Sequence, residues 1–343
     1  MSKLWIIRNR LISAAIPVSA VAVMCALIVV VFAIMLISLS VGNQFIGIGQ
    51  ILFDMFSRSD TLSEFIAQSL RFPRVVMSAI VGAALASSGL LLQSMIRNPL
   101  ASPDVIGITG GASAAAITYL SFFSSTLGIF WLPFFSILGA FSAVLLVYCL
   151  AWRNGITPMR LILVGMGISA LMGAITTFAI AASPLSTSIT AYIWLTGSVY
   201  GANWKDVQAL LPWVCVSLPF LLLFTRQINA QELGDQISTG LGISVQSLRL
   251  GMLIISVVLA APAIAYVGAI GFVGLIAPHI ARRIVFRSFG LLLPVSALLG
   301  ACLVMLADLV GRTVFLPLDV PAGVFVSAIG APFFIYLLYR QRF

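Results

Sequence analysis

The sequence predicts an all-α membrane protein with about ten transmembrane helices, and three observations support this prediction. Of the 343 residues, 61% are hydrophobic and only 8% are charged, whereas soluble domains are about 45–50% apolar and about 25% charged. Several charge-free stretches exceed the roughly 20 residues that a membrane helix needs. The net charge of +9 comes from single basic residues between apolar runs, as in cytoplasmic loops of membrane proteins rather than in nucleic-acid-binding surfaces.

The charge-free stretches locate the spans in order along the chain. The first apolar run continues to about Ser40, which is too long for a signal peptide, so we expect a membrane span there. The uncharged stretch 105–152 suits two spans with a break near 124–128, and a Ser/Thr-rich segment after the fifth span allows a short extra helix. The expected spans are 17–40, 75–96, 105–123, 129–151, 159–182, 206–225, 248–267, 270–285, 289–310 and 321–339.

Charge placement gives the orientation of these spans. With both termini in the cytoplasm, the outer side holds only five of the 18 basic residues, namely Arg58, Arg71, Arg74, Lys205 and Arg312. The positive-inside rule favours this arrangement. Only the outer stretch 42–74 and the inner stretch 226–249 are long outside the spans, and neither has room for a soluble enzyme domain. We therefore expect one transmembrane domain over residues 1–343.

Several kinds of chemistry are missing from the sequence. No Gly-Lys pair is followed by Ser or Thr, so this chain has no P-loop for ATP. His279 is the single histidine, and the four cysteines are far apart, so we expect no metal site and no bound cofactor. We expect His279, which follows Pro278, to lie in a turn near the inner surface. Asp308 is the one candidate for a proton-relay carboxylate inside the membrane. Because such carboxylates are otherwise missing, we expect any energy for transport to be supplied from outside this chain.

A set of motifs along nearly the whole chain resembles one transporter family. They are Arg71-Phe-Pro-Arg74, the small-residue run 81–89, Arg97-Asn-Pro-Leu-Ala-Ser-Pro-Asp-Val, the run 271–283 that ends in Ala-Pro-His-Ile-Ala-Arg-Arg, Leu306-Ala-Asp-Leu-Val-Gly-Arg312 and Pro321-Ala-Gly-Val. In this order they resemble the FecCD family of ABC importer permeases, which serve siderophores, haem and vitamin B12. With Arg153-Asn-Gly-Ile, they look most similar to ferric-catecholate (enterobactin-type) permease subunits.

The resemblance implies a fold, a location and partners. The fold would be that of type II ABC importer permeases, such as the vitamin B12 permease, in the inner (plasma) membrane. A cytoplasmic ABC ATPase dimer would hydrolyse ATP, so this chain would be a transport subunit and not an enzyme. A periplasmic or lipid-anchored siderophore-binding protein would deliver an iron(III)–siderophore. A second permease chain, identical or related, would complete the pore.

Three arginines are expected at the outer side, where the resemblance implies docking of the binding protein. Arg71 and Arg74 flank a proline just before the second span, and Arg312 ends the ninth. Pro73 disfavours a helical conformation for Phe72, which predicts that the helix starts abruptly there. Guanidinium groups in this position could bind carboxylates of a partner in a bidentate manner. Alternatively, they could anchor the span ends at lipid headgroups.

The inner loop predicts a contact with another protein. Within residues 229–246, Leu233, Ile237 and Leu241 recur every four residues, which suits one short amphipathic helix. Gly242 lies where a helix C-cap takes a left-handed conformation. The resemblance implies that this helix couples to the ATPase subunit, with Glu232, Leu233, Gly234, Ile237, Leu241 and Gly242 as the contact residues. A helix lying on the membrane would instead favour a basic polar face, which this segment lacks.

Two smaller sites complete the expectations. Asn98 follows the second span at the inner side, where the resemblance suggests an inner gate and a plain turn is the alternative. Asp308 and Arg312 are four residues apart on one predicted helix, so we expect a structural ion pair.

Other functions remain open at this stage. The chain could import haem or cobalamin, or it could be a secondary carrier driven by an ion gradient. A membrane-embedded enzyme would need polar residues clustered at one depth, which the sequence lacks.

Overall fold

The computed structural model describes all residues except 1–3, 9–12, 43, 51–64, 286–287 and 341–343. The described chain is helical apart from β1 (Leu4–Arg8) and β2 (Ser13–Pro17), a short antiparallel pair absent from the all-α expectation. The helices are α1 (Val18–Ser40), the π-helix η1 (Ile66–Arg71), α4 (Phe72–Ile96), α5 (Ile108–Phe122), α6 (Ser124–Leu127), the 3₁₀ helix η2 (Ile129–Trp131), α7 (Leu132–Ala151), α8 (Pro158–Ala181), α9 (Leu185–Thr196), α10 (Trp204–Leu223), α11 (Thr225–Glu232), α12 (Asp235–Gly240), α13 (Val245–Val267), α14 (Val273–Ile284), α15 (Phe289–Thr313) and α16 (Ala322–Arg340).

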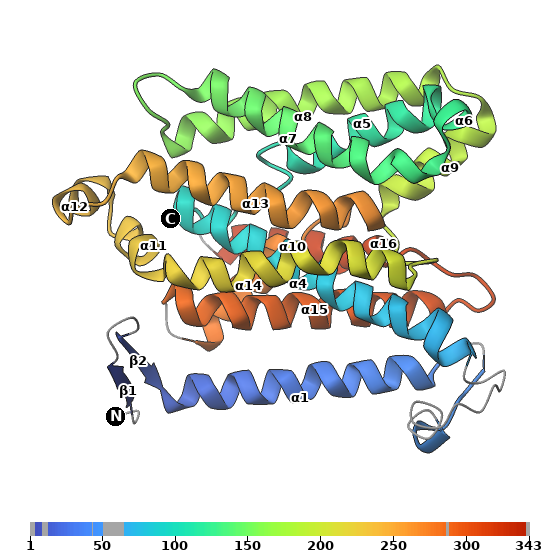
Figure 1. Ribbon diagram of the computed structural model, residues 1–343, viewed down its shortest axis with the longest axis horizontal. Helices are drawn as coiled ribbons and strands as arrows, with labels where there is room; N and C mark the ends of the chain where they lie inside the picture. Colours follow the sequence, from blue (N-terminus) through green and yellow to red (C-terminus); the bar gives the residue numbers. More distant parts are fainter. Residues whose placement is uncertain (1–3, 9–12, 43, 51–64, 286–287, 341–343) are drawn as a thin grey trace.

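The long helices run side by side as one bundle (Figure 1). Within the described residues, eight helical segments are long and apolar enough to cross a membrane. Two further helices in expected span regions are shorter, since α5 has 15 residues and α14 has 12. The break near 124–128 and the extra helix after the fifth span, which the sequence predicts, are α6 and α9.

The most buried helix is α4, which packs against α13, α14 and α15. Pairs of glycines let these backbones touch. A Cβ atom at Gly89 would lie 1.9 Å from the carbonyl oxygen of Gly274 on α14, and one at Gly82 would lie 2.2 Å from that of Gly300 on α15. Without side chains between them, the helices make extensive van der Waals contact, which is the main packing force within a membrane. The α4, α14 and α15 helices therefore form a tightly packed unit.

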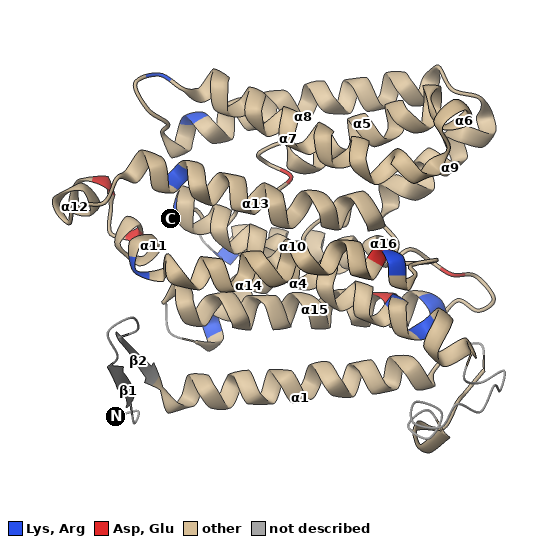
Figure 2. Cartoon of the chain, viewed as in Figure 1, with Lys and Arg blue, Asp and Glu red and all other residues tan. Residues whose placement is uncertain are grey.

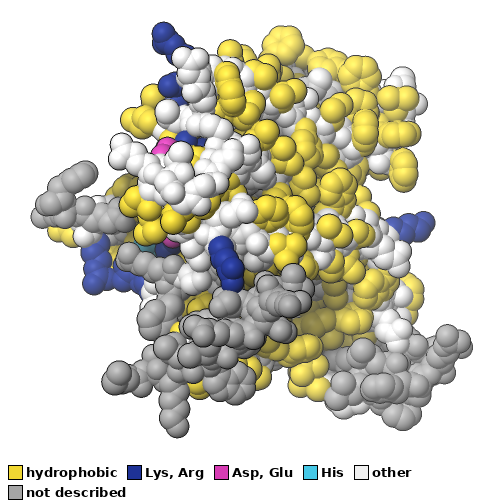
Figure 3. All heavy atoms as spheres, turned by 60° about the vertical axis from the view of Figure 1, so that its left-hand side comes forward, with side chains coloured by type: hydrophobic (Ala, Val, Ile, Leu, Met, Phe, Trp, Pro, Cys, Tyr) yellow, Lys and Arg dark blue, Asp and Glu magenta, His cyan; other side chains and the backbone are white. Residues whose placement is uncertain are grey.

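The two ends of the bundle carry most of the charge, whereas its middle is nearly free of it (Figure 2). Both termini lie at the left end in Figure 1, together with α11 and α12. We call this the inner end and the opposite one, with η1, α6 and α9, the outer end. A broad hydrophobic surface lies between them, with basic side chains mostly toward the inner end (Figure 3). This distribution is that of a membrane protein whose lipid-facing belt separates two wet ends.

The structure corrects two local predictions about proline. Phe72 is helical, with φ −63° and ψ −48°, because η1 continues directly into α4 and Pro73 occupies the first turn of α4. Proline is tolerated at that position, so the helix does not start abruptly at Phe72. His279 lies inside α14 and not in a turn, since the helix continues through Pro278. Its Nε2 accepts a hydrogen bond from Nε of Arg283 at 3.3 Å.

Candidate functional site

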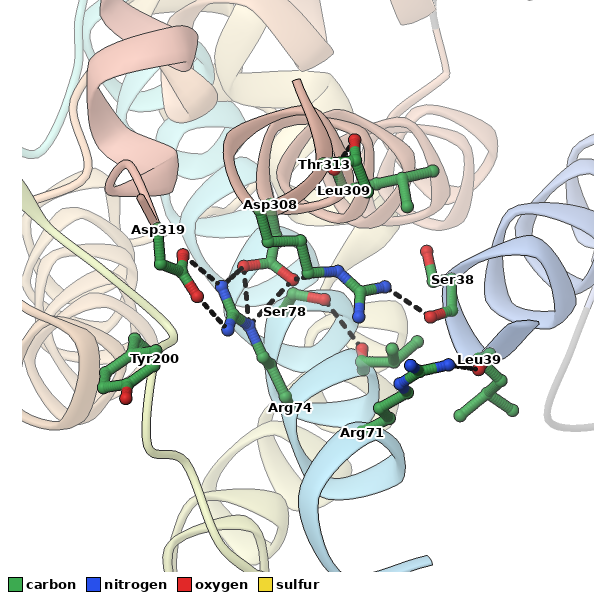
Figure 4. A network of polar contacts seen from close by, with 12 residues as sticks. Ser38, Leu39, Arg71, Arg74, Ser78, Tyr200, Asp308, Leu309, Thr313 and Asp319 are labelled. Atoms are coloured by element: carbon green, nitrogen blue, oxygen red, sulfur yellow. Dashed lines mark hydrogen bonds and ion pairs between the residues drawn. The ribbon is translucent and has the colours of Figure 1, made fainter. Parts of the chain in front are cut away.

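At the outer end, Arg74 of α4 lies between two carboxylates (Figure 4). Its Nε and Nη2 donate to Oδ1 of Asp308 on α15, at 2.9 and 2.7 Å. Its Nη1 and Nη2 donate to the two oxygens of Asp319, in the segment between α15 and α16, at 2.6 and 2.8 Å. The ring of Tyr200 lies over the guanidinium at 5.5 Å. Both donor edges of Arg74 are therefore occupied within the chain.

Asp308 also faces Arg312, as the four-residue spacing predicts, with a distance of 3.7 Å between Nε of Arg312 and Oδ2 of Asp308. This is longer than the 2.7 Å contact between Asp308 and Arg74, so the partner closest to Asp308 comes from another helix. Arg312 itself donates through Nη2 to the carbonyl oxygen of Ser38 on α1. No pattern in the sequence predicts the Arg74–Asp308 and Arg74–Asp319 pairs, since the two residues of each pair are more than 230 residues apart.

Arg71 connects the start of α4 to the end of α1. Its Nη1 donates to the carbonyl oxygens of Leu39 and Ser40, at 2.7 and 3.1 Å, and its Nη2 donates to that of Gln44 at 2.6 Å. These acceptors include orphan carbonyls of the last turn of α1, where a cation is favourable. Arg71 is thus satisfied by backbone oxygens and not by a carboxylate among the described residues.

The structure therefore brings the three predicted docking arginines together at one end, and each is less than 10% exposed. All three have partners within the chain. They carry three positive charges against the two negative charges of Asp308 and Asp319, so the cluster keeps a net charge of +1. We call these five residues, Arg71, Arg74, Asp308, Arg312 and Asp319, the outer arginine cluster.

At the inner end, residues 225–242 contain the expected coupling helix, and we call them the coupling segment. They form two short helices rather than the single helix that the apolar spacing predicts. The first, α11, ends at Glu232, and α12 starts at Asp235. Gly234 separates them with φ +117° and ψ 158°, a conformation that only glycine adopts readily. Gly242 has φ +79° just after α12, the left-handed conformation expected of a residue that ends a helix.

Three apolar side chains of this segment point away from the chain. Leu233 is 64% exposed, Ile237 52% and Leu241 63%. We call these three residues the apolar stripe. Ser238 and Gln231, on the same two helices, are fully buried, so one face of the segment packs against the bundle and the other remains open. An open apolar face of this kind is typical of a surface that binds another protein.

Ion pairs hold this segment in place. Asp235, at the start of α12, accepts from Nη2 of Arg249 on α13 at 2.8 Å and from Nη2 of Arg97, just after α4, at 3.1 Å. Arg249 also donates to the carbonyl oxygen of Ile156, between α7 and α8, at 2.8 Å. One carboxylate therefore connects the coupling segment to α13 and to the end of α4, and Arg249 extends this connection to the loop between α7 and α8.

Asn98 lies in the turn after α4. Its side-chain oxygen accepts from the backbone N–H of Leu100 at 2.9 Å, and its own N–H donates to the carbonyl oxygen of Gln93 at 3.1 Å. The geometry is that of an Asx turn, in which asparagine replaces a backbone carbonyl. In the same loop, burial raises the pKa of the Asp104 carboxyl. Hydrogen bonds with Thr109 and Ser102 act in the opposite direction but are outweighed by burial.

In the described parts of the chain, no three His, Cys, Asp or Glu side chains gather where they could hold a metal ion. The polar groups at both ends bind one another or backbone oxygens. The arrangement suits recognition by charge and shape at two surfaces on opposite sides of a membrane.

Comparisons with known proteins agree with this arrangement. The model of the FecCD transport family matches residues 26–340. The achromobactin transport system permease protein of Dickeya dadantii (strain 3937) is 53% identical over 315 residues, covering 92% of this chain and 90% of that protein. The iron(3+)-hydroxamate import system permease protein of Bacillus subtilis (strain 168) is 41% identical, with 95% and 98% covered. The ferric enterobactin transport system permease protein of Escherichia coli (strain K12) is 39% identical, with 79% and 81% covered.

The relatives include the enterobactin type that the motifs suggest, together with permeases named for achromobactin and hydroxamate transport, so they support siderophore permeases as a class. Among solved structures, a chain of an inward-facing metal-chelate type ABC transporter superposes with a TM-score of 0.84 at 28% identity. The match covers 93% of this chain and 99% of that one. The chain belongs to the FecCD transport family and has the fold of a metal-chelate type ABC transporter permease.

Proposed function

We propose that this chain is the pore-forming permease subunit of an ATP-driven importer that carries an iron(III)–siderophore across the inner membrane. The observation that carries the proposal is the family match over residues 26–340, together with relatives named for achromobactin, hydroxamate and enterobactin transport. These ligands differ in chemistry but share a chelated ferric ion. The proposal therefore names this class and not one siderophore.

The proposed topology has ten membrane segments, which include the short helices α5 and α14, and both termini in the cytoplasm. Two features support it. Both termini lie at the same end of the bundle (Figure 1), as an even number of crossings requires. Helices of 15 and 12 residues that pack within the bundle are covered by other helices and need not match the full bilayer thickness. A second permease chain, identical or related, would pair with this one around the transport path.

The apolar stripe is the proposed contact with a cytoplasmic ABC ATPase dimer, with Glu232, Gly234 and Gly242 shaping the segment around it. The stripe is exposed and lies at the inner end with both termini, and its segment is held by Asp235 to α13 and to the end of α4. Asn98 follows α4 beside the same network, and we assign it to the inner gate. A shift of the segment by the ATPase would pass to α4 and α13 through Asp235.

The outer arginine cluster is the proposed docking site for the siderophore-binding protein. Its net positive charge and its three convergent guanidinium groups favour acidic side chains on that partner. Replacing Arg71 and Arg74 by Glu should weaken docking strongly at low salt and less at high salt. The measurement is the affinity of the binding protein for the complete transporter in lipid nanodiscs. An unchanged affinity would remove the docking role.

Transport itself is tested in proteoliposomes that contain this chain, its permease partner and the ATPase. The binding protein loaded with radioactive ferric siderophore is added on the side of the outer end. We expect uptake only when ATP is present on the side of the ATPase, and no uptake when a proton or sodium gradient replaces ATP. Uphill movement of the chelate without the ATPase subunit would overturn the proposal.

A further inference from the structure

We infer that Asp319 competes with a carboxylate of the docking partner for Arg74. Asp319 holds the segment 314–321 against Arg74 until an acidic side chain of the partner takes its place. This inference rests on the proposed docking function of the outer arginine cluster. It adds a specific residue, Asp319, that no family motif in the sequence includes, and it assigns the segment before α16 a state that depends on docking.

The two carboxylates that bind Arg74 are not equivalent. Asp308 is part of α15, its side chain is 3% exposed, and it also faces Arg312. Asp319 belongs to the segment between α15 and α16, and its side chain is 27% exposed. Removing Asp308 would take the counter-charge from buried Arg312 and leave buried Arg74 with Asp319 alone, whereas water can reach Asp319. Asp319 is therefore the carboxylate that can be exchanged at low cost.

The geometry leaves an incoming carboxylate one route to Arg74. The Nε–Nη2 edge is held by Asp308, and the face of the guanidinium carries the ring of Tyr200. The remaining Nη1–Nη2 edge is held by Asp319 through two hydrogen bonds (Figure 4). This paired contact is the one that a carboxylate makes with arginine in protein recognition. A bidentate partner at Arg74 must therefore displace Asp319.

Few other contacts hold the segment. Four of its side chains are large, apolar and exposed by 47% to 69%, namely Val314, Phe315, Leu316 and Leu318. Its backbone bonds run to neighbouring turns of the chain, from Val314 to Val310, from Leu318 to Phe315, from Val320 to Gly311 and from Val324 to Pro321. The ring of Phe315 lies 5.9 Å from that of Phe325 on α16. The side-chain contact of Asp319 with Arg74 is thus a large part of what positions the segment.

Release of Asp319 would reach the start of α16 directly. Two residues after the segment, the N–H of Gly323 donates to the carbonyl oxygen of Gly197 at 2.9 Å, at the C-terminal end of α9. A Cβ atom at Gly323 would lie 2.0 Å from the carbonyl oxygen of Thr196. The α16 and α9 helices therefore touch through their backbones beside the segment. Docking at Arg74 and the position of these two helices are linked through Asp319.

The test compares Asp319→Asn with Asp206→Asn in the complete transporter in nanodiscs. Both variants remove one negative charge at the outer end, but Asp206 lies in the first turn of α10 and does not contact Arg74. Asparagine keeps the shape of aspartate and retains an acceptor oxygen. We expect D319N to raise the affinity of the binding protein about fivefold or more, and D206N to change it less than about twofold. Equal effects of the two variants would mean that only net charge matters, and would overturn the inference.

The outcome also separates this inference from the docking proposal. If Arg74→Gln weakens docking and D319N does not strengthen it, the docking site stands and the competitor role fails. If neither variant changes the affinity, the docking proposal itself fails. Retained assembly of D319N with the ATPase shows that the variant is folded.

A second readout follows the segment itself. In a chain whose four cysteines, Cys25, Cys149, Cys215 and Cys302, are replaced by alanine, spin labels at Leu318→Cys and Lys205→Cys report the distance between the segment and α10. We expect the binding protein to broaden or shift this distance, and D319N to produce the same change without the binding protein. An unchanged distance in D319N would contradict the inference.

Discussion

The outer and inner ends of this permease differ in which side chains they bury and which they expose. At the outer end, the polar groups with the greatest potential for binding a partner are buried and paired within the chain, because Arg71, Arg74 and Arg312 are each less than 10% exposed. At the inner end, the ion pairs are partly open to water, and it is the apolar side chains that remain uncovered. At the outer end, charged groups must therefore break contacts within the chain before they can bind a partner. At the inner end, the apolar side chains are already exposed.

The largest effect should come from removing the most buried carboxylate of the outer end. Asp308→Ala leaves Arg74 and Arg312 in a site that is nearly closed to water. Breaking a buried ion pair in this way costs about 3–5 kcal/mol. We expect a large fall in the thermal stability of the detergent-solubilised protein and low yield in the membrane. A stable D308A variant would show that the cluster is not the structural centre of the outer end.

The next effect should be on assembly and not on folding. Replacing Leu233, Ile237 and Leu241 by Ser removes the apolar stripe, and burial of each such side chain contributes about 1.5–3 kcal/mol. We expect the affinity for the ATPase subunit to fall by about 100-fold or more, since every 1.4 kcal/mol is tenfold. The melting temperature of the isolated permease should change little.

The matched control for the stripe replaces Gln236 and Thr239 by Ser. Both are exposed on the same segment but are polar. The control should bind the ATPase normally. Equal losses in both variants would mean that the segment acts through its overall conformation rather than through its apolar side chains.

A smaller effect is expected at Arg71. Arg71→Gln removes hydrogen bonds from a charged donor to the carbonyl oxygens of Leu39, Ser40 and Gln44. Bonds to charged groups are worth about 1.5–3 kcal/mol in net stability. Arg71→Lys keeps the charge but not the forked donor and should recover only part of the loss. Full recovery in thermal unfolding by lysine would show that charge alone holds α1 to α4.

The smallest effect is expected at the inner end. Asp235 has a side chain that is 44% exposed and Arg97 one that is 33% exposed, so water screens this pair. Arg249, which is buried, keeps its hydrogen bond to the carbonyl oxygen of Ile156 when the carboxylate is removed. We expect Asp235→Ala to cost about 1 kcal/mol or less in stability, but to reduce ATP-dependent transport because the coupling segment loses its tie to α4 and α13. Transport equal to that of the native protein would place the coupling route elsewhere.

The positions of the helices were predictable from the sequence because a lipid environment imposes a simple rule, namely long stretches without charge. The C-terminal end of α4, the start of α15 and the break at α6 follow from this rule and from turn-forming residues. The short lengths of α5 and α14 were not predictable, since helices that are covered by other helices have no fixed length requirement. The break at Gly234 was also missed, because the four-residue spacing of the apolar stripe continues across it.

The candidate site was predictable only in part, for a related reason. Local spacing indicated that Arg71 and Arg74 lie together and that Asp308 faces Arg312. The contacts of Arg74 with Asp308 and Asp319 depend on how α4 meets α15, which single-sequence patterns do not report. Burial of the arginines was missed for the same reason. A hint was present, since an aspartate inside an apolar helix needs a counter-charge, and Arg312 of the same helix need not be its nearest partner.

The α4 helix reaches from the outer end of the bundle to the inner end as one continuous rod. Arg74 is in its first turn and Arg97 directly follows its last, so 23 residue steps of about 1.5 Å place their backbones about 35 Å apart. Contact of its glycines with Gly274 and Gly300 leaves no layer of side chains that could yield between the rod and its neighbours. A force on the outer tip would therefore tilt or shift the entire helix, and the inner tip would move with it. Coupling between the two ends of this permease then needs no series of small side-chain movements, because one stiff helix reaches both ends.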